Sequence, residues 1–172
     1  MRDDLKENIR VSLQHSLPFL LSLLYILINY APSRLWLLND IRPAVGVICV
    51  FYWMLYRPDL FNMVVVFVLG FISDILSSAP MGTDIISFLA IYVVISNLSS
   101  LFNNKPFTFI WLGFGIVFIG VAFLKWLISS IYYAHFLPLS TLFFTLLFTI
   151  ACYPVISFIN DAARKYLMND EG

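Results

Sequence analysis

The sequence predicts an all-α membrane protein with six transmembrane helices. Of its 172 residues, 61% are hydrophobic and 12% are charged, whereas about a quarter of the residues in an ordinary soluble domain are charged. The apolar residues form six long runs, and most charged residues lie in the gaps between them. A chain of this length could not bury so much apolar surface in water. We therefore expect a single integral membrane domain.

Each run can cross the hydrocarbon core of a bilayer, about 30 Å thick, as a helix rising about 1.5 Å per residue. The runs cover residues 11–30, 41–56, 60–78, 84–101, 107–128 and 138–159. The second run is short and is expected to rely on neighbouring helices. The third contains Val64, Val65 and Val66, a strand-like pattern, but an open strand in lipid would leave backbone groups unpaired. A helix is the better prediction there.

The charges flanking these runs predict the topology. The first run follows a basic start, like a signal peptide, but acidic residues there and a poor cleavage site favour an uncleaved helix. With six spans both termini lie on one side, and the positive-inside rule favours the cytoplasm. The cations expected inside are Arg2, Lys6, Arg10, Arg57, Lys105, Arg164 and Lys165, against Arg34, Arg42 and Lys125 outside. Aromatic residues near the predicted span ends, among them Tyr52, Trp53 and Trp126, are expected to be interfacial anchors.

One group of residues, in the third run and the turn after it, is a candidate functional site. Gly70, Ser73, Asp74 and Ser77 share one helix face by their spacing, and three of the four are small. Small residues let a second helix approach closely, and a carboxylate on that face can find a donor there instead of lipid. This face is therefore expected to be an internal seam.

The candidate partners of Asp74 are cations in the outer half of the membrane, Arg42 first and Lys125 second. A Pro-Gly turn, with Pro80 and Gly82, follows the seam. Two interpretations remain open: the seam pins helix packing, or it contacts a ligand or a partner.

The sequence does not indicate an enzyme. His15 and His135 are predicted on opposite sides of the membrane, so they could not share a site. Asp74 and Asp84 could form a carboxylate pair, but Asp84 is more simply an N-cap of the fourth helix. Cys49 and Cys152 lie in apolar runs without metal-ligand spacing, and no phosphate loop or nucleophile motif is present. We expect no cofactor or metal, and the balanced charge does not indicate nucleic acid.

About a third of the chain, from Ile41 to about Val94, carries Arg42-Pro43, the stretch from Tyr52-Trp53 to Pro58, and then Gly70, Asp74, Ser77 and Gly82. In these residues the chain resembles the rod shape-determining protein MreD family. The resemblance implies a scaffold of the bacterial cell-elongation complex in the inner membrane. That scaffold would bind MreC and help couple MreB filaments to the SEDS glycosyltransferase and its penicillin-binding transpeptidase. It also implies a fold similar to the substrate-binding subunits of energy-coupling-factor vitamin transporters, and it transfers no catalytic residue.

That fold similarity leaves one alternative of a different class, a substrate-binding subunit of a small-molecule transporter. Such a site needs a cavity with convergent polar groups. The polar residues available in the spans are Asn29, Ser73, Asp74, Ser96 and Asn97, toward different ends of the helices. A scaffold acting through its helix faces and rims is the first prediction. Gly113, Gly115 and Gly120 are then expected to serve packing within the chain more often than contact with a partner.

Overall fold

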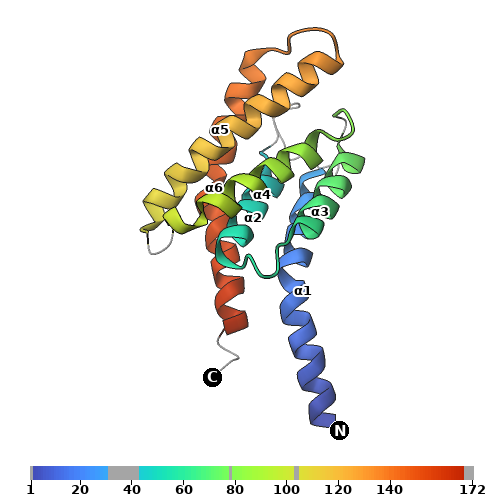
Figure 1. The fold of residues 1–172 in the computed structure, drawn as a ribbon, viewed down its shortest axis with the longest axis vertical. Coiled ribbons are helices and arrows are strands. Elements are labelled where there is room, and N and C mark those ends of the chain that lie inside the picture. The colour runs from blue at the N-terminus through green and yellow to red at the C-terminus, as the bar shows by residue number, and fades with distance from the viewer. Residues whose placement is uncertain (1, 31–42, 78, 103–104, 169–172) are drawn as a thin grey trace.

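The computed structural model describes residues 2–30, 43–77, 79–102 and 105–168, with side chains described from residue 16 to residue 165 within those ranges (Figure 1). Six helices follow one another along these ranges. They are α1 (Arg2–Tyr30), α2 (Val45–Tyr56), α3 (Met63–Leu76), α4 (Thr83–Phe102), α5 (Phe107–Tyr132) and α6 (Leu139–Met168). For the described residues the prediction of an all-helical fold is confirmed, including the helix through the three valines at 64–66.

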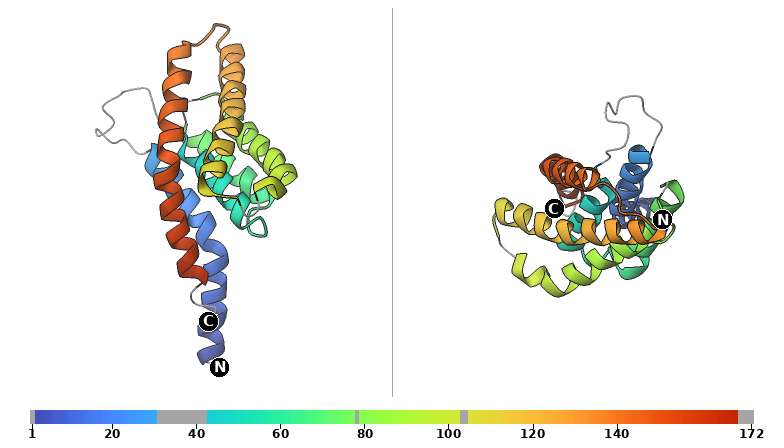
Figure 2. Two further views of the ribbon diagram at one scale, coloured as in Figure 1. Left: turned by 90° about the vertical axis from the view of Figure 1, so that its left-hand side faces the viewer. Right: turned by 90° about the horizontal axis from the view of Figure 1, so that it is seen from above.

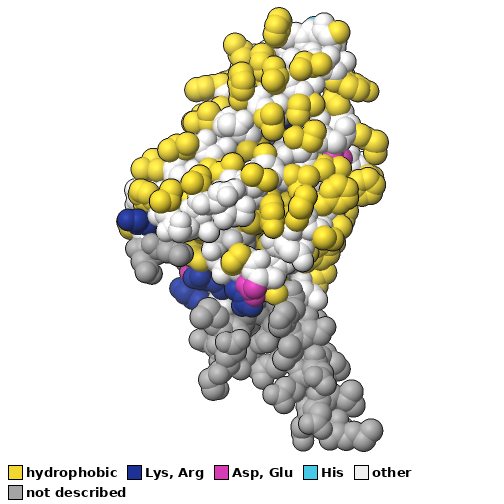
Figure 3. All heavy atoms as spheres, in the orientation of Figure 1, with side chains coloured by type: hydrophobic (Ala, Val, Ile, Leu, Met, Phe, Trp, Pro, Cys, Tyr) yellow, Lys and Arg dark blue, Asp and Glu magenta, His cyan; other side chains and the backbone are white. Residues whose placement is uncertain are grey.

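Three of the helices are long and apolar enough to cross a membrane: α4, α5 and the segment Leu139–Lys165 of α6. The other apolar helical segments are shorter and cover Ser16–Tyr30, Val45–Tyr56 and Met63–Leu76. Large apolar side chains remain exposed on every long helix, for example Ile116 at 73% and Phe158 at 77%. Figure 3 shows these side chains spread over the visible face, with cationic side chains near the end where α1 begins. The chain is therefore built for a lipid surrounding.

Helix α2 is the centre of the bundle, because α1, α4 and α6 all pack on it. Nine of its twelve residues are buried. The Phe51 ring packs edge-on against the rings of Phe102, Phe114 and Tyr153. The prediction that Tyr52 and Trp53 are interfacial anchors is wrong, since they are 1% and 0% exposed. Their helix is enclosed by its neighbours, so its aromatic residues form the protein core.

Helices α3 to α6 form two hairpins of different length, α3–α4 and α5–α6. Helices α3 and α4 pack against each other, and α3 is short. Helices α5 and α6 form a longer hairpin whose connecting end extends beyond the shorter helices in both side views (Figures 1 and 2). That end is tied by a hydrogen bond of 3.1 Å from the Trp126 indole N–H to the Leu137 carbonyl.

The start of α1 and the end of α6 lie at the opposite end of the molecule (Figure 1). There the Tyr52 hydroxyl donates to Asp161 at 3.1 Å, and Arg164 also binds Asp161 at 2.6 Å. The Arg164 guanidinium lies over the Tyr56 ring, 4.4 Å from its centre. These contacts fix the last turns of α6 against the last turns of α2.

Candidate functional site

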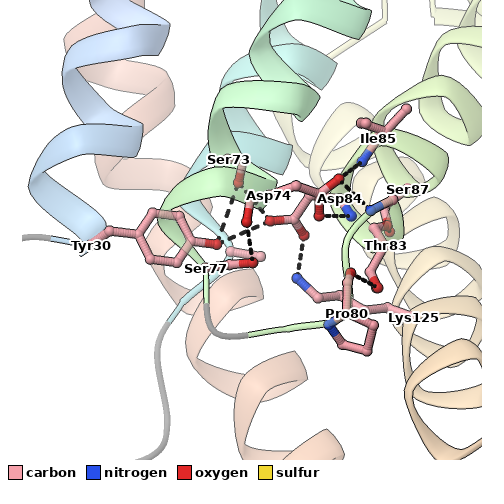
Figure 4. A network of polar contacts seen from close by, with 12 residues as sticks. Tyr30, Ser73, Asp74, Ser77, Pro80, Thr83, Asp84, Ile85, Ser87 and Lys125 are labelled. Atoms are coloured by element: carbon pink, nitrogen blue, oxygen red, sulfur yellow. Dashed lines mark hydrogen bonds and ion pairs between the residues drawn. The ribbon is translucent and has the colours of Figure 1, made fainter. Parts of the chain in front are cut away.

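The carboxylate of Asp74 caps the N-terminus of α4 from the neighbouring helix α3 (Figure 4). Its Oδ1 accepts from the backbone N–H of Asp84 at 2.9 Å. Its Oδ2 accepts from the N–H groups of Gly82 at 3.0 Å and Ile85 at 3.1 Å. The first turn of a helix has N–H groups without an internal partner and a partial positive charge, so an anion there is stabilising. Asp74 is 2% exposed, and the three backbone donors stabilise its carboxylate.

Local sequence explains why the chain can make this cap. Gly82 has φ +94°, a left-handed conformation that glycine adopts without the steric cost of a side chain. The Pro80 carbonyl accepts from the Thr83 hydroxyl at 2.6 Å, which fixes the turn. Gly70 brings α3 close to α4, because a Cβ placed there would lie 2.8 Å from the Ile85 Cα. The turn and the close approach together aim the carboxylate at the start of α4.

A second buried carboxylate, Asp84, lies in the first turn of α4 and forms an ion pair with Lys125 of α5. Its Oδ2 accepts from the Ser73 hydroxyl at 2.6 Å and from the Tyr30 hydroxyl at 3.1 Å. Asp84 is 3% exposed. Side chains from α1, α3 and α5 therefore converge on one carboxylate of α4, and the network joins four helices.

The sequence predicts that Asp74 pairs with a cation and that Asp84 caps α4, and the structure shows the reverse. Lys125 pairs with Asp84 rather than with Asp74, and Arg42 lies outside the described residues. The prediction that Asp84 is the N-cap of its own helix is wrong. Its side chain points away from its helix end to Ser73, Tyr30 and Lys125 (Figure 4), and Asp74 supplies the cap in its place.

The structure distributes the other predicted residues over several environments. Gly70 and Ser73 are buried in the α3–α4 contact, and Ser77, at the end of α3, donates to the Asp74 carbonyl at 3.3 Å. Trp53 lies in the α2 core, away from this group. Gly113 faces the Phe102 ring, and a Cβ at Gly120 would have nothing within 4 Å. His135 is exposed between α5 and α6, and the side chain of His15 lies outside the described residues.

Sequence reasoning missed Tyr30 and the pairing of Asp84 with Lys125. One signal could have found the pair. Lys125 stands alone in the apolar run 107–128, and Asp84 opens the apolar run before it. A lone cation in such a run needs an anion within reach, and Asp74 was not the sole acid available. Tyr30 gives no comparable signal, because a tyrosine at the end of an apolar helix is common.

This polar group borders a cavity of about 280 Å³. Tyr30, Ser73, Asp84 and Lys125 line one part of the cavity, and mainly apolar residues of α1, α2, α4, α5 and α6 line the rest. Among the described residues, no three His, Cys, Asp or Glu side chains are grouped as metal ligands. Both carboxylates already hold three donors each, so the group is suited to fixing helices rather than to moving protons.

A family model for the rod shape-determining protein MreD matches residues 9–160. The chain belongs to the MreD family. It is also 28% identical over 165 residues to an uncharacterised protein of Rickettsia prowazekii (strain Madrid E), with 94% of each chain covered. No solved structure matches the fold.

Membership of the MreD family supports a rod-shape-determining membrane protein. The family is one of structural, generally non-enzymatic proteins, and membership does not favour the transporter alternative. The expected likeness to energy-coupling-factor subunits stays a prediction, because no solved structure carries it.

Proposed function

We propose that this MreD-family chain is a non-catalytic inner-membrane scaffold of the bacterial cell-elongation complex. In this proposal it controls rod shape by linking MreC and the MreB cytoskeleton to peptidoglycan synthesis by the SEDS glycosyltransferase and its transpeptidase. The family match over residues 9–160 is the observation that carries the proposal. The geometry supports it, because the buried polar groups bind helices to one another and the outer faces are apolar.

The proposal includes six membrane crossings with both termini in the cytoplasm. In its support, α1 begins and α6 ends at the same end of the molecule (Figure 1). Arg57 follows α2, Lys105 lies between α4 and α5, and Arg164 and Lys165 lie near the end of α6. With alternating helix directions these cations belong to that same end, where the positive-inside rule requires them. The one described cation of the other half, Lys125, is held by Asp84.

The partner surface in this proposal is the free end of the α5–α6 hairpin, which we call the crest. It presents large apolar side chains at high exposure: Ile131 71%, Tyr132 67%, Phe136 83%, Leu139 64% and Phe143 62%. The crest extends beyond the shorter helices (Figure 2). A single-span partner such as MreC can pack the base of its outer domain against the crest.

Site-specific photo-crosslinking tests this surface. p-Benzoylphenylalanine replaces Phe136 at the crest or, as a matched control, Phe158 near the other end of α6; the two are 83% and 77% exposed. After irradiation of cells we expect a covalent adduct with MreC from position 136 and little from position 158. Adducts with MreC at neither position, or at 158 alone, would contradict the crest as the interface.

Depletion in the source cell tests the role itself. Rod-shaped cells are expected to become round as the protein is lost, and the crest variant Phe136→Asp is expected not to restore their shape. Cells that keep their rod shape after depletion would overturn the scaffold proposal.

A further inference from the structure

The cavity beside the Asp84–Lys125 pair has the features of a ligand site. Its volume is about 280 Å³, just below the range of about 300–1,000 Å³ that is usual for small-molecule pockets. We propose that it binds an uncharged amphiphile, whose head both donates and accepts hydrogen bonds and whose short alkyl part lies among the apolar residues. A hydroxyl or carboxamide head fits this description.

The charge of the lining argues for an uncharged ligand. Among the residues that line the cavity, Lys125 is the cation and Asp84 the carboxylate, and they neutralise each other. A charged head would add an unpaired charge to a mostly apolar enclosure, which is costly. An anion would also meet the carboxylate of Asp84, and a cation would meet the ammonium of Lys125.

Two lining residues argue for a head that donates and accepts. Asn29 is 8% exposed, and its Oδ1 has no hydrogen-bond partner among the described residues. A buried acceptor of this kind requires a donor. The Lys125 ammonium has three N–H donors, its side chain is 38% exposed, and Asp84 is its acceptor in the described part of the chain. It can therefore donate to a ligand oxygen in the cavity.

The rest of the wall suits an alkyl chain. Ile26, Val47, Phe88, Phe118 and Ala122 line it and are 6% exposed or less. The glycine at position 46 lets the Phe88 ring take its place in this wall, because a Cβ at position 46 would lie 2.8 Å from the Phe88 Cζ. Apolar walls with a few placed polar groups are typical of small-molecule sites.

The test uses the full chain in lipid nanodiscs and tritiated 1-decanoylglycerol, a neutral probe whose glycerol head has hydroxyl donors and acceptors. Scintillation proximity measures binding, and empty nanodiscs give the background. We expect saturable binding that Ala122→Leu, which fills the cavity, weakens at least about tenfold. The matched control is Ala151→Leu, the same change at an exposed position of α6, which should leave affinity unchanged.

Two further arms test the chemistry of the head. Decanoate and decylamine carry the same alkyl length with a negative or a positive head, and each should compete at least about tenfold more weakly than unlabelled 1-decanoylglycerol. Asn29→Leu is close in size and removes the amide, so it should weaken binding several-fold even if Ala122→Leu fails to fold. Absence of saturable binding, equal competition by decanoate, or equal affinity of Asn29→Leu and the unchanged chain would overturn the proposal.

This inference goes beyond the scaffold function and does not depend on it. The assay contains no partner protein, so a negative result would leave the crosslinking to MreC untouched. Binding is proposed here, and transport is not.

Discussion

Two aspartates of the α3–α4 hairpin are buried in apolar surroundings, and different kinds of donor satisfy them. Asp74 takes three backbone N–H groups at the start of α4. Asp84 takes two hydroxyls and an ammonium. A buried carboxylate without such donors would cost several kcal/mol. Each aspartate can therefore be buried in this fold only because its hydrogen-bond donors are present.

Replacing Asp74 with Leu should destabilise the protein, because the backbone N–H groups of Gly82, Asp84 and Ile85 lose their acceptor. We expect a loss of about 1–3 kcal/mol in the free energy of unfolding, and lower abundance in cells. Thermal unfolding of the purified protein in detergent measures the first, and immunoblotting the second. Ser77→Ala is the control, since the Ser77 hydroxyl makes one bond of 3.3 Å. Unchanged stability of Asp74→Leu would refute the cap.

The Asp84–Lys125 pair should behave as one unit. Asp84→Asn and Lys125→Met each leave one charge without its partner in an apolar place, so each should destabilise the chain. The loss in the free energy of unfolding should be smaller than the roughly 3–5 kcal/mol that follows from removing one partner of a fully buried pair, because the Lys125 side chain is 38% exposed. The double variant should lose less than the sum of the two single losses. Additive losses in thermal unfolding would show that the pair is not coupled.

Among the elements, the helices could be predicted from sequence and their surroundings could not. Hydropathy places every helix because an apolar run in lipid must satisfy its backbone internally. A helix that is apolar all round can face lipid or the protein core, and this is why the burial of Tyr52 and Trp53 in α2 was missed.

The seam of small residues was predictable for a related reason. Helical spacing places Gly70, Ser73 and Asp74 on one face, and these three residues are buried. Which carboxylate meets Lys125 depends on how α4 is rotated against α5. Spacing within one helix carries no information about that rotation.

The different surroundings of Gly70 in α3 and Gly120 in α5 predict opposite effects of a change to alanine. At Gly70 a methyl group would lie 2.8 Å from the Ile85 Cα, so the helices must separate, and we expect a loss of about 1–3 kcal/mol. At Gly120 nothing lies within 4 Å, so alanine should stabilise α5 by about 0.5–1 kcal/mol. Thermal unfolding of both variants is the measurement. A stable Gly70→Ala variant would mean that the two helices are further apart than the structure has them.

For the whole molecule, the six-crossing proposal predicts which reporters are active. Green fluorescent protein fused after residue 172 should fluoresce, as it folds in the cytoplasm. Alkaline phosphatase inserted after His135, in the α5–α6 connection, should be active, as it requires the outer compartment. Phosphatase placed after Lys105 is the control and should be inactive. The reverse pattern would invert the topology, and phosphatase activity after both Lys105 and His135 would contradict a crossing by α5.

The cap on α4 also bears on how the protein is made. The amides that bind Asp74 lie eight to eleven residues further along the chain, so α3, the turn and the first residues of α4 are sufficient to form it. A nascent chain can close this hairpin soon after Ile85 enters the bilayer, before α5 delivers Lys125. We therefore expect α3 and α4 to leave the insertion machinery already in contact with each other, so that the later helices assemble on this pair.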